Sequence, residues 1–153
     1  MDKFSKIDKD GQGKVIGILK NIFSNCTLDI EQHIEDKGRV DIIMTSTTPK
    51  GKEYKYAIEC KDRYCSSTQY NDWMIEVDKY NTLKEYSEKG YKPIYFNTFS
   101  DNTFMVWNLD KAEINEGYQI TPKTTVEDNG YINRLRYYLP SSECSCSGTF
   151  HYK

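Results

Sequence analysis

Residues 39–61 read RVDIIMTSTTPKGKEYKYAIECK, which is two strand-like segments on either side of a turn. The first segment, Arg39–Ser46, is compact and β-branched, and the second, Tyr54–Cys60, alternates apolar with polar side chains. Both patterns are typical of strands. Between them, Thr48–Lys52 contains a proline and a glycine, which is a turn signal. The stretch is therefore expected to form an antiparallel hairpin.

This hairpin carries two carboxylates and a lysine that its pairing would bring together. Asp41 lies within the first strand, and Glu59 and Lys61 flank Cys60 at the end of the second. Strand side chains alternate in direction, so Glu59 and Lys61 point to one side of the sheet. Antiparallel pairing would place Asp41 beside Glu59. The alternative is a solvated strand face, on which a Glu59–Lys61 ion pair contributes roughly 0–1 kcal/mol.

The combination suits metal-assisted hydrolysis of a phosphodiester. Carboxylate oxygens and a backbone carbonyl form a hard-oxygen site of the kind that Mg²⁺ or Mn²⁺ prefers. Such an ion polarises a phosphoryl group and generates hydroxide from bound water. Lys61 would orient that water or stabilise the charge that develops on the phosphate.

The segments around the hairpin predict a mixed sheet flanked by helices. A helix that joins the Tyr54–Cys60 strand to a strand at Lys92–Thr98 is a crossover, as parallel neighbours require. The expected fold class is α/β, more closely an α+β mixed sheet, in αβββαβ order. The first further element is a helix over Gly13–Ser24, whose start Gly11 and Gly13 leave open to an earlier position. The others are strands at Thr27–Glu35 and Thr103–Asn108, a helix over Thr68–Glu88, and a last strand or short helix at Tyr131–Leu139. The tail Ser141–Lys153 is not assigned.

The second predicted helix, Thr68–Glu88, contains an acid on its apolar face. At 100° per residue, Glu76 falls on one stripe with Trp73 and Tyr80. Burying an unpaired carboxylate is costly, so Glu76 should face a metal site or a cation such as Lys61. Glu76 is therefore a fourth candidate catalytic residue. The competing interpretation is an ordinary surface pair between Glu76 and a lysine on the same helix.

Length and composition bound the number of domains and the class of protein. The chain has 153 residues, is 37% hydrophobic and 14% aromatic, and has a formal net charge of −2. These values predict one domain over residues 1–153 and exclude a strongly basic nucleic-acid coat, but not a local basic patch. The apolar runs are too interrupted for a membrane span, and the N-terminus lacks a signal-peptide pattern. We therefore expect a cytoplasmic protein, in the host cytoplasm if its source is viral.

Four basic residues are candidate nucleic-acid contacts. Lys50 and Lys52 lie in the hairpin turn, Arg63 is expected near them by strand order, and Lys79 lies on the second predicted helix. Basic side chains along a surface neutralise successive phosphates. The competing interpretation is an ordinary solvated hairpin, which is at least as common.

The segments Gly38–Ile43 and Ala57–Arg63 resemble the D…(D/E)-x-K signature of the PD-(D/E)XK, or restriction-endonuclease-like, nucleases. The expected αβββαβ order is similar to the core of that family. The resemblance covers about residues 8–110, and residues 115–153 would be a C-terminal extension of the same domain.

The resemblance implies a role for each residue of the motif. Asp41 and Glu59 would bind Mg²⁺ or Mn²⁺, the carbonyl of Cys60 would complete the protein ligands, and Lys61 would be the catalytic lysine. The run Trp73–Tyr80 also resembles a helix of some phage-encoded nucleases of this family, which points to a phage source.

One departure from the family concerns the first helix, where members often carry a glutamate. This chain has none between Gly11 and Asn25, and Gln12 is the nearest polar residue. Glu35 or Asp36, just before the Asp41 strand, could contribute instead. The sequence therefore leaves the choice between one and two metal ions open.

The function predicted from these residues is a Mg²⁺- or Mn²⁺-dependent endonuclease. DNA is the expected substrate, in resolution, repair, packaging or restriction, and RNA stays open. A homodimer is expected because double-strand cleavage needs two active sites and one chain supplies one. One alternative is a catalytically inactive module of the same fold that binds nucleic acid or protein. Another is a small α/β protein in which the Glu-Cys-Lys triplet is accidental.

Overall fold

The computed structural model describes residues 3–33, 39–122 and 131–151. Its main sheet has six strands in the order β1-β2-β3-β5-β6-β9, and a second sheet has the order β4-β8-β7. Only β3 and β5 pair in parallel, so the main sheet is mixed, as the sequence predicts. The elements are α1 (Lys3–Ile22), β1 (Thr27–Gln32), β2 (Ile42–Thr47), β3 (Glu53–Asp62), β4 (Asp72–Glu76), α2 (Val77–Glu88), β5 (Lys92–Thr98), β6 (Thr103–Asn108), β7 (Asn115–Pro122), β8 (Tyr131–Pro140), a 3₁₀ turn (Ser141–Glu143) and β9 (Cys146–Thr149).

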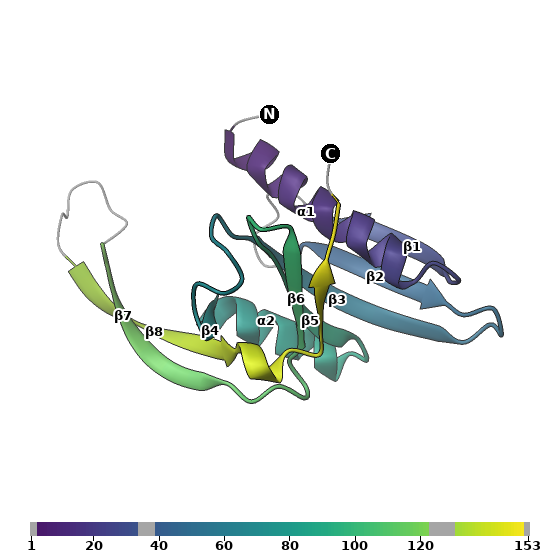
Figure 1. The fold of residues 1–153 in the computed structure, drawn as a ribbon. Helices are drawn as coiled ribbons and strands as arrows, with labels where there is room; N and C mark the ends of the chain where they lie inside the picture. Colours follow the sequence, from purple (N-terminus) through teal and green to yellow (C-terminus); the bar gives the residue numbers. More distant parts are fainter. Residues whose placement is uncertain (1–2, 34–38, 123–130, 152–153) are drawn as a thin grey trace.

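Each face of the main sheet is covered by a different layer (Figure 1). Helix α1 packs on one face, where Val15, Ile18 and Leu19 are almost fully buried. Helix α2 and the three-stranded sheet cover the other face, around Trp73 and Trp107. The sheet therefore lies between two apolar cores, and burial of both its faces drives the fold.

The hairpin predicted from residues 39–61 is present as β2 and β3. Ile42 lies opposite Ile58 and Thr47 opposite Glu53. The turn is closed by hydrogen bonds within Thr48–Lys52, and Gly51 has a φ of 85°, which explains the need for glycine there. β2 begins only at Ile42, so β3 runs past its neighbour at the end that carries Cys60–Asp62.

Helix α1 starts ten residues earlier than the predicted Gly13, at Lys3. Two glycines made that boundary uncertain in the sequence. In the structure Gly11 marks a close approach between α1 and β3, because a Cβ at this position would lie 3.2 Å from the Cβ of Asp62. The helix therefore crosses the free end of β3.

The predicted helix Thr68–Glu88 is wrong in its first half. Asp72–Glu76 forms strand β4, and α2 starts only at Val77. Trp73 and Ile75 are buried at every second position and lie opposite residues of β8 that are more than 60 positions later. Pairing with so distant a strand overrode the local helical pattern. Glu76 is consequently the last residue of β4 and the N-cap of α2, and does not belong to a helical stripe.

The C-terminal part extends the two sheets. Tyr131–Pro140 is a strand, which settles the alternative between strand and short helix. The unassigned tail supplies β9, which pairs with β6 at the edge of the main sheet. β1 ends at Gln32, earlier than the predicted strand. In the described part of the chain, no helix is long and apolar enough to span a membrane.

Candidate functional site

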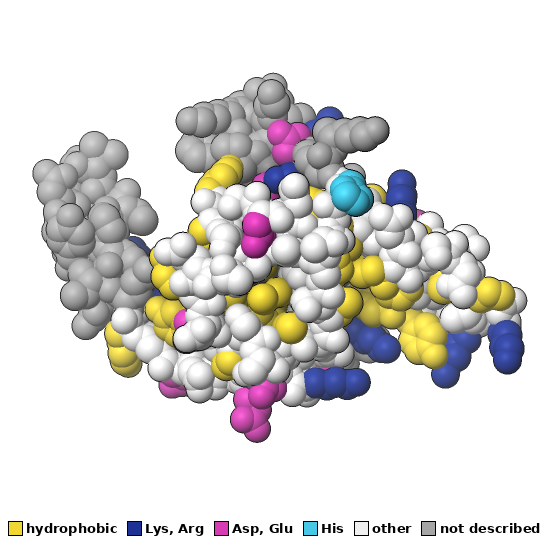
Figure 2. Space-filling view, in the orientation of Figure 1, with side chains coloured by type: hydrophobic (Ala, Val, Ile, Leu, Met, Phe, Trp, Pro, Cys, Tyr) yellow, Lys and Arg dark blue, Asp and Glu magenta, His cyan; other side chains and the backbone are white. Residues whose placement is uncertain are grey.

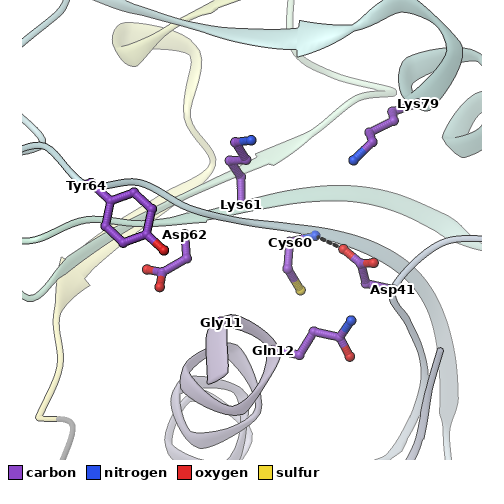
Figure 3. Close-up of a pocket in the computed structure, with 8 residues that line it drawn as sticks. All are labelled: Gly11, Gln12, Asp41, Cys60, Lys61, Asp62, Tyr64 and Lys79. Carbon is purple, nitrogen blue, oxygen red and sulfur yellow. Dashed lines mark hydrogen bonds between the residues drawn. The ribbon is translucent and has the colours of Figure 1, made fainter. Parts of the chain in front are cut away.

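A pocket of about 200 Å³ lies where β3 runs past the start of β2 (Figure 3). Both faces of the β3 end contribute to it, because no β2 residue pairs with this end. Lys61 and Lys79 lie on one side of the strand, and Cys60 Sγ, Asp62 and Gln12 lie on the other (Figure 3). The lining residues are Gly11, Gln12, Asp41, Cys60, Lys61, Asp62, Tyr64 and Lys79.

Asp41 lines this pocket and contacts Glu59, as the hairpin pairing predicts, although Glu59 itself is not among the lining residues. Oδ2 of Asp41 accepts a hydrogen bond of 2.8 Å from the backbone N–H of Cys60. The Glu59 carboxyl lies within hydrogen-bond reach of the Asp41 carboxyl and is only 6% exposed. Burial, and then the like charge of Asp41, raise the pKa of Glu59 well above its usual range. Burial and the nearby Asp41 thus make ionisation of Glu59 costly unless a cation is close.

Lys79, which the sequence placed among nucleic-acid contacts, forms an ion pair with Glu59. Its Nζ lies 3.1 Å from Oε1 of Glu59, and its side chain is 43% exposed. Burial lowers the pKa of Lys79, but the ion pair with Glu59 and the charges of Glu76 and Asp41 together outweigh this effect and raise it above the ordinary value. Lys79 reaches the site because α2 starts at Val77, so that the first turn of the helix faces β3.

Lys61 and Cys60 point in opposite directions from β3, as strand alternation requires. Lys61 is exposed and lines the pocket on the side of Lys79. The Cys60 side chain packs against the core under α1, and burial raises the pKa of its thiol. A thiol held neutral in this way is a poor nucleophile.

Two further polar residues of the pocket are held by partners within the chain. Gln12 is 2% exposed, donates to the His33 carbonyl and accepts from Gln32. Asp62, which sequence reasoning missed, forms an ion pair of 3.0 Å with Lys14. Asp62 directly follows the motif lysine, but strand alternation turns its side chain toward α1. Glu35 and Asp36, the other candidates for the missing helix-one glutamate, lie outside the described residues.

Glu76 is not among the residues that line the pocket. It is half-buried at the junction of β4 and α2, and its carboxylate raises the pKa of Lys79 through space. The structure therefore connects Glu76 with the site only through Lys79. Among the residues described, no three His, Cys, Asp or Glu side chains gather into a metal-binding group.

The hairpin lysines lie far from the pocket, which corrects the expectation that they are near Arg63. Lys50 and Lys52 are at the turn before β3, and Arg63 directly follows its last residue. A ten-residue strand spans about 30 Å. Figure 2 shows dark-blue side chains around the hairpin end of the molecule.

Arg63 is tied into the interior of the protein. Its Nη2 donates to the Met74 carbonyl at 2.7 Å, its Nε donates to Asn97 Oδ1, and its guanidinium lies over the Trp73 ring. These contacts fasten β4 to the main sheet. Asn97 is fully buried, and its Nδ2 has no hydrogen-bond partner among the described residues.

Replacement of Arg63 by Met is expected to destabilise the fold by about 2 kcal/mol, because it leaves buried acceptors of Met74 and Asn97 without their charged donor. Urea denaturation without nucleic acid measures the effect, and Lys111→Met, which removes an exposed charge elsewhere, is the control. A loss below about 0.5 kcal/mol, the usual range of surface substitutions, would return Arg63 to the candidate nucleic-acid contacts.

No protein-family model, no curated protein and no solved structure matches this chain. The function proposed for this chain therefore rests on the geometry of the pocket.

Proposed function

We propose that the chain is a Mg²⁺- or Mn²⁺-dependent nuclease that hydrolyses phosphodiester bonds of DNA. The observation that carries this proposal is a pocket lined by Asp41 and Lys61, with the buried Glu59 in contact with Asp41. The order α1-β1-β2-β3-β4-α2-β5, in which β4 belongs to the second sheet and β3 is parallel to β5, supports a restriction-endonuclease-like core. A two-fold dimer belongs to the proposal, because two such sites would be needed to cut both strands of a duplex.

The donor set fits a hard divalent cation. Two carboxylates lie together, and one of them already attracts an ammonium group at 3.1 Å, so the position favours positive charge. Asp41 and Glu59 would hold the ion. The Cys60 N–H points to Asp41, and its carbonyl points to the same side because both groups of a strand residue face one neighbour. When bound, the ion would polarise a phosphoryl oxygen and lower the pKa of water.

The remaining groups of the pocket act on the substrate through charge. Lys61 is exposed beside the carboxylates, where its ammonium can contact a phosphate oxygen and stabilise charge that develops in the transition state. Lys79 partly offsets the burial and the like charge that raise the pKa of Glu59, and so favours the ionised form that a metal ion requires. Both lysines also attract the phosphate backbone to the pocket.

A cleavage assay tests the proposal directly. Labelled single-stranded DNA, duplex DNA and RNA are incubated with Mg²⁺, Mn²⁺ or EDTA, each with the wild-type chain and with Glu59→Gln. We expect cleavage of DNA that requires Mg²⁺ or Mn²⁺ and is lost in EDTA and in Glu59→Gln. Cleavage that persists in EDTA or in the variant would contradict the proposed site.

A binding module without turnover is the second candidate function, and the Lys79–Glu59 ion pair favours it. An ammonium that already neutralises Glu59 reduces the attraction of the site for a metal ion. Titration with Mn²⁺ by calorimetry separates the candidates. The nuclease should bind Mn²⁺ with an affinity that falls in Asp41→Ala, whereas the module should bind nucleic acid equally well with and without the metal.

A further inference from the structure

The lip of the pocket presents one aromatic ring, that of Tyr64. It is 80% exposed and is the only aromatic residue among those that line the pocket. Within the described ranges, its side chain makes no hydrogen bond and no contact with another ring. Tyr70, on the same β3–β4 loop, differs because it packs edge-on against Trp73 at 5.4 Å. Tyr64 therefore contributes little to the packing of the protein.

The exposure of Tyr64 does not come from a loose loop. The N–H of Arg63 donates to the Thr98 carbonyl at 2.8 Å, and the Cys65 carbonyl accepts from Ser100 at 3.0 Å. The backbone on each side of Tyr64 is thus fixed to the end of β5. The ring is presented from a rigid support, so little entropy is lost when a ligand contacts it.

A flat, solvent-exposed ring in a pocket that is also lined by lysines is a surface on which nucleobases stack. In Figure 3, Lys61 projects from one side of the end of β3, and the Tyr64 ring lies on the side of Asp62, whose charge is paired with Lys14. A phosphate that contacts Lys61 would bring a neighbouring base to the Tyr64 ring. Bases inside a duplex have both faces covered by their neighbours, so only an unpaired base can stack there without disrupting the helix.

We propose that Tyr64 is a stacking platform for an unpaired base next to the scissile phosphate, which makes single-stranded DNA, or a single-stranded segment of a longer DNA, the preferred substrate. This inference rests on the proposed nuclease function for the position of the phosphate. It adds to that function the class of DNA that the pocket accepts.

The test is a binding titration of fluorescein-labelled oligothymidylate and of a blunt duplex, with Ca²⁺ present. Tyr64→Ala should weaken binding of the single strand by about 5- to 150-fold, the range equivalent to one stacked base. Tyr64→Phe should retain the affinity, because the ring face is kept. Tyr118→Ala, which removes another exposed tyrosine on β7, is the matched control and should change neither titration. The melting temperature of Tyr64→Ala should equal that of the wild type.

Unchanged single-strand affinity in Tyr64→Ala, an equal loss for the blunt duplex, or no measurable single-strand binding by the wild type would each overturn the inference. Cleavage is measured in a separate assay, so that the stacking role and the nuclease function can fail independently. Metal-dependent cleavage with normal binding by Tyr64→Ala would remove the stacking role and leave the nuclease. A selective loss of single-strand binding without any cleavage by the wild type would keep the stacking role and remove the nuclease.

Discussion

Asp41→Asn is expected to lower metal-dependent cleavage by about 10³-fold or more without destabilising the fold. A bound ion contributes several kcal/mol to the transition state, and each 1.36 kcal/mol is tenfold in rate. Asparagine keeps an oxygen that can accept the 2.8 Å hydrogen bond from Cys60, but it lacks the charge that an ion requires. Single-turnover cleavage measures the loss, and Asp29→Asn on the exposed face of β1 is the control.

The same variant should be as stable as the wild type or more stable when EDTA is present. Asp41 is one cause of the raised pKa of Glu59, so its charge makes ionisation of Glu59 in the folded state more costly. A group whose pKa is higher in the folded than in the unfolded state loses stabilising effect as the pH rises through the folded pKa. Asp41→Asn should therefore gain most at neutral and higher pH, and the gain should shrink as the pH falls. A large drop in melting temperature would show that Asp41 has a structural role, and full cleavage would show that it does not hold the catalytic ion.

The predictable part of the fold is the part in which pairing partners are close in sequence. β2 and β3 are joined by a short turn, and their apolar alternation and turn residues determine the register that brings Asp41 to Glu59. β5 and β6 are joined by a similarly short turn around Asn102, which has a φ of 58°. Local sequence patterns are sufficient to predict these two pairings, because few alternative pairings bury the same side chains.

The elements that sequence reasoning missed depend on distant partners. β4 is only five residues long, and its Trp73 also falls on a helical stripe with Glu76 and Tyr80, so the strand is recognised only once β8 is known to lie beside it. β9 contains small polar residues and is stabilised by its pairing with β6. Such segments have weak intrinsic preferences, and tertiary contacts decide their structure.

The residues of the candidate site also fall into two groups, those that local sequence patterns place and those that distant contacts place. The positions of Asp41, Glu59 and Lys61 follow from hairpin register and alternation, and both are readable from the sequence. The approach of Lys79 depends on where α2 starts, which the misassigned β4 concealed. The exposure of Tyr64 depends on hydrogen bonds from the loop to Thr98 and Ser100, which no local pattern indicates.

Lys61→Ala is expected to lower the rate of the chemical step by roughly 10²- to 10³-fold, the effect of removing one preorganised charge-stabilising group. Lys61 is exposed, so its loss should change the melting temperature little. The affinity for Mn²⁺ should persist, because both carboxylates remain. Most of the affinity for DNA should also persist, because one phosphate contact among several contributes a small share.

This pattern separates catalysis from simple binding, because an interaction made mainly in the transition state affects rate and leaves binding nearly intact. Lys111→Ala removes an exposed positive charge elsewhere and controls for the overall change in net charge. Lys79→Ala provides a contrast, since it leaves the buried Glu59 without its 3.1 Å partner and should therefore alter stability and metal affinity together. A wild-type single-turnover rate in Lys61→Ala would remove its catalytic role. The motif lysine would then be an ordinary solvated residue at the end of β3, whatever activity the carboxylates support.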